Sequence, residues 1–499
     1  MKEQAPILII AIPLIVSFLN IIAGLIRRNF CYPITVLTML SCVYLSFVIL
    51  DTVIETGKIS YRLGGWEPPW GIEYVVDHLN AYMLVIVSIV SFVVAFYSKR
   101  SIEKELHPSK IIYFYTIYLL LATGLLGILV TGDLFNLFVF LEIASLAGYA
   151  LIAIGEDKAP LATFNYIIMG TIGACFYLLG VGYLYIVTGS LNIADLTRLL
   201  PPLYESKVVL VAFAFFVVGV AVKIALFPLH TWLPDAYTLA PSTVSAFVSA
   251  TMTKVGAYAM IRVMFTVFEP SFSFETFPTM QILGWVASAA MMFGCIMALA
   301  QTDLKRMLAY ILVAEVGYIV MGVSVGNREG FTGAVLHILN DSFMMVSLFL
   351  IAGALMYKEG HRNITKLANI NKKMPVTMGC FIIAAISMVG VPPTAGFFSK
   401  WYLILGAINA QQWFFVAFLL LSSLMVAVAF FRIVQNIFFK PSESHEGHSS
   451  HAHEEPVRDE VPFSMQLPIF VMSMSLLIIG FFSGQIISNV IQYTVPKGF

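Results

Sequence analysis

The chain consists largely of apolar runs long enough to cross a lipid bilayer, and these runs recur from one end to the other. A helix needs about 20 predominantly apolar residues to span the hydrocarbon core. Hydrophobic residues make up 59% of the sequence and charged residues only 11%, which leaves little material for a water-soluble domain. The sequence therefore predicts an all-α polytopic membrane protein.

Fourteen membrane spans are predicted, and proline interrupts two of them. The first span has no basic leader and no small-residue cleavage site, so we expect a retained helix rather than a signal peptide. The expected ranges are 5–26, 31–51, 77–97, 111–131, 133–153, 162–188, 208–238 (broken), 243–266, 280–300, 306–326, 331–357, 375–410 (broken), 413–437 and 463–490.

Loop charges predict the orientation of these spans. One set of alternate loops, which includes Lys305, holds seventeen lysines and arginines, and the other set holds eight. Because basic loops are retained on the cytoplasmic side, we place the richer set in the cytoplasm and both termini outside. Three lysines, Lys223, Lys254 and Lys400, belong to no loop and lie deep inside apolar runs. An ionisable residue at that depth is a functional candidate, because it costs about 3 kcal/mol to insert.

The two interrupted spans share a design, in which a proline break lies beside a buried lysine. The first break follows Lys223 at Phe227-Pro228, and the second, at residues 390–396, precedes Lys400. Proline removes a backbone donor, so the freed carbonyls need protein or water around them in the bilayer. The breaks are five spans apart, and an odd number of spans reverses the chain direction. This pattern is typical of the inverted repeats that hold ion sites in transporters.

Acidic and histidine side chains accompany the lysines at bilayer depth. Glu142 and Glu315 each lie about 14 Å into a span at the helical rise. An unpaired carboxylate there would take up a proton, whereas a buried cation would keep it ionised. His337 and Asp341 are four residues apart on one helix face, where they could pass a proton or bind a cation. The alternative roles are a neutral Glu142 hydrogen-bonded between helices and a His337 that only packs.

Other polar residues are expected nearer the membrane surfaces. His230 and Asp235 follow the first break, where they would connect its cavity to cytoplasmic water. His78 is interpreted as an interfacial residue. The Gly-Gly-Trp and Pro-Pro-Trp sequences in the long external connection 51–73 predict turns with tryptophans at the interface, and this connection is interpreted as structural.

No motif indicates a cofactor, a metal site or a nucleic-acid partner. The sequence lacks GxGxxG after a strand and lacks ligand-spaced cysteines, and its formal net charge is zero. Redox chemistry within this chain is therefore not expected. The cytoplasmic loop 438–462 contains His445, His448, His451 and His453. Clustered histidines can bind a metal, but without cysteines or a rigid frame a solvated loop is favoured.

Four stretches of the sequence carry a resemblance to a known family. They read VKIALFPLHTWLPDAYTLAPSTVSAFVSATMTKVGAY, GDLFNLFVFLEIASL, DLKRMLAYILVAEVGY and VPPTAGFFSKWYL. Over residues 75–440 the chain resembles the proton-pumping membrane subunits of respiratory complex I and their relatives in multisubunit Mrp sodium/proton antiporters. In its length, and in lacking a long lateral helix after the last span, the chain is most similar to the MrpD-type component of the Mrp antiporter.

The resemblance implies a fold of fourteen helices with two inverted five-helix repeats, helices 4–8 and 9–13, in which helices 7 and 12 are broken. The implied domains are 1–110 (helices 1–3), 111–266 (first repeat, a proton half-channel), 280–437 (second repeat), 438–462 (the histidine-rich loop) and 463–499 (the last helix).

The resemblance also implies site roles. Family positions that carry protons match Glu142, Lys223, Lys254, Lys400, His337, His230 and Asp235. Relatives commonly have a histidine where Asp341 stands and a lysine where Met345 stands. The connection between Lys254 and Lys400 is therefore left to waters, Asp341 or Glu315.

The function implied is an ion-translocating subunit of a Mrp-type antiporter in the bacterial cell membrane, which moves protons inward as sodium leaves. Its partners would be the other subunits of that complex. The alternative is a proton-pumping subunit of complex I or of a membrane-bound hydrogenase. A third hypothesis, a structural scaffold, predicts that removing the buried charges is harmless or stabilising.

Overall fold

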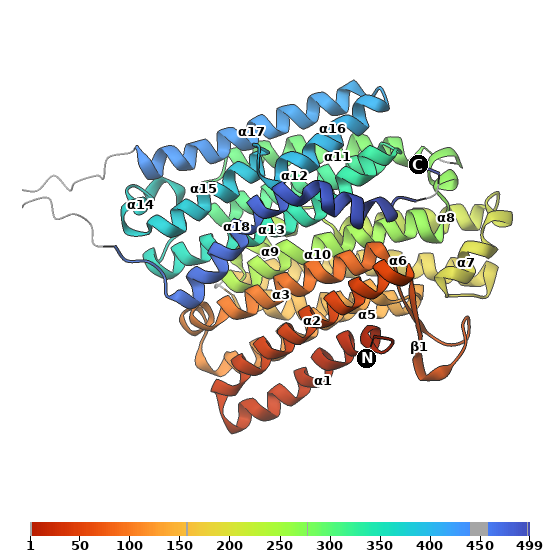
Figure 1. The fold of residues 1–499 in the computed structure, drawn as a ribbon, viewed down its shortest axis with the longest axis horizontal. Helices are drawn as coiled ribbons and strands as arrows, with labels where there is room; N and C mark the ends of the chain where they lie inside the picture. Colours follow the sequence, from red (N-terminus) through yellow and green to blue (C-terminus); the bar gives the residue numbers. More distant parts are fainter. Residues whose placement is uncertain (1, 156–157, 277, 440–457, 497) are drawn as a thin grey trace, which may run out of the picture.

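The molecule is a bundle of long helices that share one axis (Figure 1). The computed structural model describes residues 2–155, 158–276, 278–439, 458–496 and 498–499. Within these residues, twelve helices are long and apolar enough to cross a membrane. They are α1 (Ala5–Ile26), α2 (Cys31–Thr56), α3 (His78–Glu105), α4 (Ile111–Val130), α5 (Leu134–Ala153), α6 (Ala159–Thr188), α10 (Ser242–Arg262), α11 (Thr279–Leu299), α12 (Leu304–Ser324), α13 (Arg328–Glu359), α17 (Trp413–Phe438) and α18 (Phe463–Asn489).

Two further spans are interrupted, which completes the fourteen that the sequence predicted. The seventh consists of α8 (Lys207–Lys223) and α9 (Leu233–Leu239), and the twelfth of α15 (Pro375–Val389) and α16 (Ala395–Asn409). Each gap contains the expected prolines, so the helical hydrogen-bond ladder stops where a donor is missing. The prediction of an all-α polytopic membrane protein with helices 7 and 12 broken is confirmed.

Short elements connect the spans. Two short helices are α7 (Ile193–Leu199) and α14 (Ile370–Lys373). The external connection after α2 forms an antiparallel hairpin of β1 (Ile59–Arg62) and β2 (Glu73–Val76), whereas the sequence predicted only turns there. Short 3-10 helices lie at Arg28–Phe30, Leu63–Gly65, Pro108–Lys110, Pro201–Leu203, Ile364–Lys366 and Ile491–Tyr493, and short π-helices at Val263–Val267 and Phe272–Thr276.

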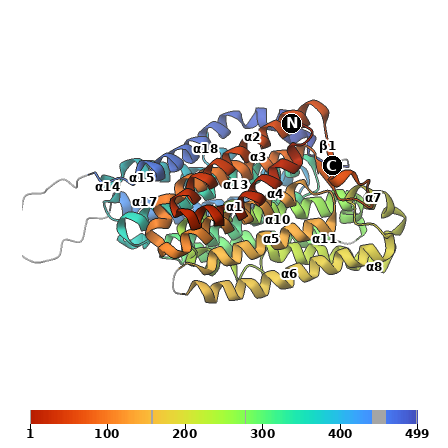
Figure 2. The ribbon, with the colours of Figure 1, turned by 90° about the horizontal axis from the view of Figure 1, so that it is seen from below.

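Burial separates central helices from peripheral ones. Every residue in the most apolar window of α12 and of α13 is buried, compared with 33% in α1 and in α17. The two views agree that α13 and α10 lie inside the bundle and α1 at its edge (Figures 1 and 2). Ionisable residues on α10, α12 and α13 are therefore surrounded by protein rather than by lipid.

The same loop-to-helix contact occurs in both repeats. Asp133 forms an isolated antiparallel bridge with Asn192, and Asp303 forms one with Asn363. Each aspartate is the N-cap of its helix, α5 or α12, and accepts a hydrogen bond from the backbone N–H three residues later. The two helices are the second of their repeats and are five spans apart, so the equivalent contacts lie at opposite membrane faces. This duplication is what an inverted repeat requires.

The termini share one end of the bundle with β1 and α7, and α14 lies at the opposite end (Figure 1). An even number of spans requires the two termini to lie on one side of the membrane. One residue assigned to a cytoplasmic loop is nevertheless buried. Lys305 has no exposed surface, and its Nζ donates to the carbonyl of Ala240 at 2.6 Å. It lies in the first turn of α12 and interacts with the C-terminal end of α9, where cations are favourable.

Candidate ion-translocation site

The first ionic contact at bilayer depth joins α5 to the end of α8. The Nζ of Lys223 lies 3.2 Å from Oε1 of Glu142 and donates to Oγ of Ser145 at 2.8 Å. The lysine side chain is 9% exposed and the glutamate side chain 28%. Lys223 is the last residue of α8 before the break, and its ammonium group contacts α5. The expected pairing of Glu142 with a buried cation is therefore present.

A second ion pair lies deeper, between α10 and α13. The Nζ of Lys254 is 2.6 Å from Oδ2 of Asp341, and neither side chain is exposed. The same ammonium group donates to the carbonyl of Ser249 at 2.7 Å. The central lysine therefore has a carboxylate partner of its own.

The third contact links α12, α13 and α16. The Nε2 of His337 lies 2.9 Å from Oε2 of Glu315, and both side chains are fully buried. The Nδ1 of His337 is 3.0 Å from Oγ of Ser399. Asn340 also donates to that hydroxyl, at 3.0 Å, so the serine is held in place. His337 and Asp341 lie on the same helix, but His337 contacts a glutamate and Asp341 contacts a lysine.

Lys400 follows Ser399 and reaches back to the second break. Its Nζ donates to the carbonyl of Met388 at 2.8 Å and to Oγ of Ser423 at 3.3 Å. It also lies 4.7 Å from the centre of the Tyr318 ring, which attracts a cation. The carbonyl of Met388 lacks a helical partner because α15 ends there. The ammonium group of Lys400 thus lies at the C-terminal end of α15, the helix that precedes the second break.

The charges on α10, α12, α13 and α16 act as one group. Glu315 interacts electrostatically with Lys400, His337 and Lys254, and Asp341 with Lys254 and Glu315. A route from the central lysine to Lys400 through Glu315, one of those that the sequence left open, remains a prediction.

The first pair stands apart from this group. Within the described residues, no hydrogen bond or ion pair joins Lys223 to Lys254. The two helices pack closely at this point, because a Cβ atom on Gly256 would come within 2.6 Å of Ile224. Gly256 is therefore required for the close approach of α8 and α10 between the two lysines.

His230 and Asp235 lie outside these contacts. His230 is buried, and its ring packs against Phe227 and Phe293, with ring centres 5.4 and 4.9 Å away. Asp235 lies 3.0 Å from Nη2 of Arg306, and both side chains are more than 40% exposed. Neither is brought to Lys223 or Lys254, and a role in proton delivery remains a prediction for both.

Sequence reasoning missed the hydroxyl and amide groups that hold the axis together. Each of these residues lies near a charged residue, either in the sequence or on a neighbouring helix. Ser145 lies one helical turn after Glu142, and Ser399 immediately precedes Lys400. Polar residues one turn away from an intramembrane charge were the available signal. The set is Ser145, Tyr318, Asn340, Ser399 and Ser423.

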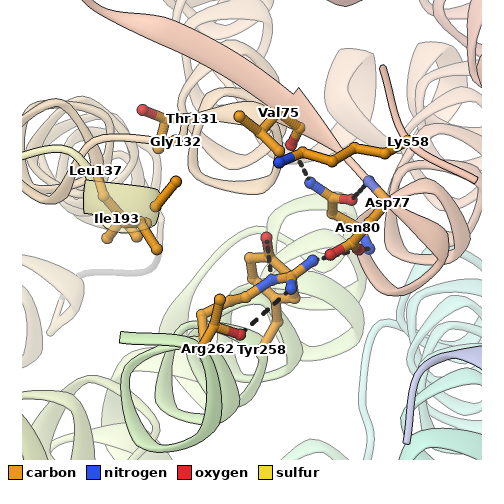
Figure 3. Close-up of a pocket in the computed structure, with 12 residues that line it drawn as sticks. Lys58, Val75, Asp77, Asn80, Thr131, Gly132, Leu137, Ile193, Tyr258 and Arg262 are labelled. Carbon is orange, nitrogen blue, oxygen red and sulfur yellow. Dashed lines mark hydrogen bonds and ion pairs between the residues drawn. The ribbon is translucent and has the colours of Figure 1, made fainter. Parts of the chain in front are cut away.

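A cavity of about 130 Å³ with charged side chains in its wall lies at the C-terminal end of α10 (Figure 3). Arg262 forms an ion pair with Asp77, and its Nε donates to the Tyr258 hydroxyl at 3.0 Å. The side-chain oxygen of Asn80 accepts a hydrogen bond from the Asp77 N–H at 2.6 Å, at the start of α3. Lys58 also lines the cavity. Lys254, four residues before Tyr258, is on the same helix face, so this cavity continues that face toward the C-terminal end of α10.

Metal ligation has no support in the described part of the chain, where no group of three or more histidine, cysteine, aspartate or glutamate side chains could hold an ion. The histidines at 445, 448, 451 and 453 lie outside the described residues.

Comparison with known proteins identifies the family. Residues 131–426 match the family described as NADH:quinone oxidoreductase/Mrp antiporter, TM. Over 504 residues the chain is 47% identical to NADH-quinone oxidoreductase subunit N of Desulforudis audaxviator, covering 99% of each protein. It is 33% identical to the D component of the Na(+)/H(+) antiporter of Alkalihalophilus pseudofirmus, covering 95% of this chain and 93% of the relative.

A solved structure supports the same conclusion. A chain of the archaeal membrane-bound sulfane sulfur reductase matches with a TM-score of 0.89 and 31% identity, covering 98% of this chain and 96% of the other. The resemblance seen in the sequence is confirmed at the family level, although identity is higher to the oxidoreductase subunit than to the antiporter D component. The chain is a multi-pass membrane protein that belongs to the NADH:quinone oxidoreductase/Mrp antiporter family of ion-translocating subunits.

Proposed function

We propose that this chain is a proton-translocating membrane subunit of a redox-driven complex of the NADH:quinone oxidoreductase type. The observation that carries ion translocation is the fully buried Lys254–Asp341 pair beside the group Glu315, His337 and Lys400. The choice of complex rests on the 47% identity to subunit N over nearly the full length. This revises the expectation of a Mrp antiporter subunit, which ranked first on sequence alone.

The mechanism follows from the balance between burial and pairing. A buried ammonium group is unfavourable unless a carboxylate is close, so moving the carboxylate changes whether the lysine holds its proton. Opening of the Glu142–Lys223 contact would favour proton transfer from Lys223 toward Lys254. The charge then moves from Lys254 through Glu315 and His337 to Lys400, laterally within the membrane.

One end of the axis, at Glu142, is open enough to exchange protons with water. Glu142 is partly exposed at its end of the axis, whereas the Lys254–Asp341 pair is sealed. Protons would be taken up on the cytoplasmic side and released outside, with both termini outside, as the loop charges predict. The redox chemistry belongs to partner subunits. A conformational change in the partner subunits would stabilise either the open or the closed form of each lysine–carboxylate pair, and so open or close it.

A second candidate is a subunit of a Mrp-type cation/proton antiporter, with the same axis carrying protons against sodium. The 33% identity to the antiporter D component over 95% of the chain favours it. The two candidates differ in their partners. Gentle purification of the tagged chain from its native membrane, with identification of co-purifying subunits by mass, separates them. Flavin and iron–sulfur proteins are expected; a set of small membrane subunits without them would support the antiporter instead.

A further inference from the structure

A basic cavity of about 180 Å³ lies at the predicted cytoplasmic side, where the turn between α1 and α2 meets the end of α3 and the start of α4. The side chains of Arg28, Lys99, Arg100 and Glu103 line it. Arg100 and Glu103 face each other at 3.6 Å, and their charges offset each other. Arg28 and Lys99 therefore give the cavity a net positive charge.

The wall of the cavity is fixed by hydrogen bonds. Lys99 lies over the ring of Tyr32, with Nζ 5.4 Å from the ring centre. Tyr32 donates to the carbonyl of Phe96 at 3.2 Å, which ties this ring to α3. Behind it, the hydroxyls of Tyr115 and Ser98 are 3.1 Å apart. The ammonium group of Lys99 is thus held at the rim of a formed cavity.

An apolar surface adjoins this basic rim. Leu25 and Ile26, at the end of α1, are 77% and 76% exposed, and Tyr113, near the start of α4, is 61% exposed. The end of α1 packs tightly on α4 there, since a Cβ atom on Gly24 would come within 2.7 Å of Ile112. Charged and apolar surfaces therefore meet within one or two helical turns, at the level of the membrane interface.

We propose that this cavity binds the phosphate headgroup of an anionic phospholipid in the cytoplasmic leaflet, with an acyl chain along the exposed surface of α1 and α4. Basic pockets between membrane helices on the cytoplasmic side recognise acidic headgroups. The start of α4 lies beside the cavity and adds the partial positive charge of a helix N-terminus. A soluble phosphate shares the headgroup chemistry, but it would gain nothing from the apolar surface.

The test uses the full-length chain within its purified complex, stripped of lipid in detergent and supplied with either phosphatidylglycerol or phosphatidylcholine. Native mass spectrometry measures the lipid retained. The wild type is expected to prefer phosphatidylglycerol, and Arg28→Gln/Lys99→Gln to lose about 25-fold in affinity for it, at about 5-fold per charge. Arg28→Lys/Lys99→Arg keeps both charges and should keep the preference. Lys366→Gln/Lys372→Gln removes two exposed cytoplasmic charges elsewhere and should change nothing.

Equal retention of the two lipids by the wild type would overturn the proposal, and so would an unchanged preference in the glutamine variant. Inorganic phosphate supplies a third arm, which needs no variant. It should neither displace phosphatidylglycerol at millimolar concentration nor stabilise the stripped complex. If it does either as effectively as the lipid, the ligand is a soluble anion and the lipid site is wrong.

Discussion

Lys254 and Asp341 form an ion pair inside the helix bundle, with Nζ and Oδ2 2.6 Å apart and neither side chain exposed. Both groups have lost their hydration, so each depends on the other. Removing one partner leaves an uncompensated buried charge, whereas removing both can be neutral or stabilising. Stability and ion movement can therefore be separated at this pair.

The single variant Asp341→Leu should destabilise the protein by about 3–5 kcal/mol, because it leaves the buried Lys254 without its carboxylate partner. The double variant Lys254→Met/Asp341→Leu should recover most of this loss. Thermal unfolding of the purified complex measures both effects. Ser347→Ala, a buried change on the same helix away from the pair, is the matched control. Equal losses in the single and double variants would contradict this dependence of each charge on the other.

The Glu142–Lys223 contact is expected to matter more for transport than for stability. Because Glu142 is 28% exposed, its desolvation is less complete than that of Asp341. Glu142→Ala and Lys223→Ala should abolish proton translocation while the complex still assembles. Proton uptake by reconstituted vesicles measures the first effect, and co-purification of partner subunits measures the second. Lys373→Ala, at an exposed surface pair with Glu359, should behave as wild type.

Much of this arrangement could be predicted from the sequence, because bilayer thickness and proline chemistry act locally. The fourteen spans, the two breaks and the inverted relation between the breaks followed from apolar run lengths and from Pro228 and Pro393. The depth of Glu142 predicted a buried cation beside it. The resemblance added the choice of Lys223 as that cation and the roles of the lysines.

Partner choice could not be predicted, because it depends on helix rotation and packing. His337 and Asp341 share a face, yet one meets Glu315 and the other Lys254. Lys305 is charged and lies next to a loop, so the neighbouring sequence gives no indication that it is buried against α9. The β1–β2 hairpin also depends on a long-range pairing that turn residues alone do not indicate.

His337 is expected to control the rate of transfer between Glu315 and Lys400, because it contacts Glu315 through Nε2 and Ser399 through Nδ1. A positioned proton carrier contributes about 10²-fold or more to a transfer step. His337→Gln should slow translocation by about that factor without loss of assembly. Ser399→Ala, which keeps the histidine but removes its second contact, should give a smaller loss. Proton flux at several pH values measures both effects. If the His337→Gln variant translocates protons at the wild-type rate, His337 is excluded from the path.

The outer ion pair gives a prediction for pH. Asp77 precedes α3 and so lies outside the span. Burial opposes its ionisation, but the charge and hydrogen bond of Arg262, together with the N–H groups of Leu79 and Asn80, outweigh this and lower the pKa of Asp77 below its ordinary value. The pair should therefore stabilise the protein at pH values above about 3.9, the ordinary pKa of aspartate. The contribution should disappear as the pH falls through the lower folded-state pKa.

Thermal unfolding of the wild type and Asp77→Asn at a series of pH values tests this. The variant should be less stable at neutral pH, and the difference should shrink in acid below the ordinary pKa. A difference that stays constant across this range would mean that the carboxylate charge contributes nothing. Asp51→Asn, at an exposed pair with Lys2, should produce little change at any pH.

The central claim is that protons pass through Lys254 when redox chemistry in partner subunits drives the complex. The direct measurement is the number of protons moved per NADH oxidised by the purified complex in sealed vesicles, comparing the wild type with Lys254→Met/Asp341→Leu. Because this double variant removes both charges together, the fold should be retained, quinone reduction should continue, and proton movement through this subunit should be lost. An unchanged proton-to-NADH ratio in the assembled double variant would contradict the claim.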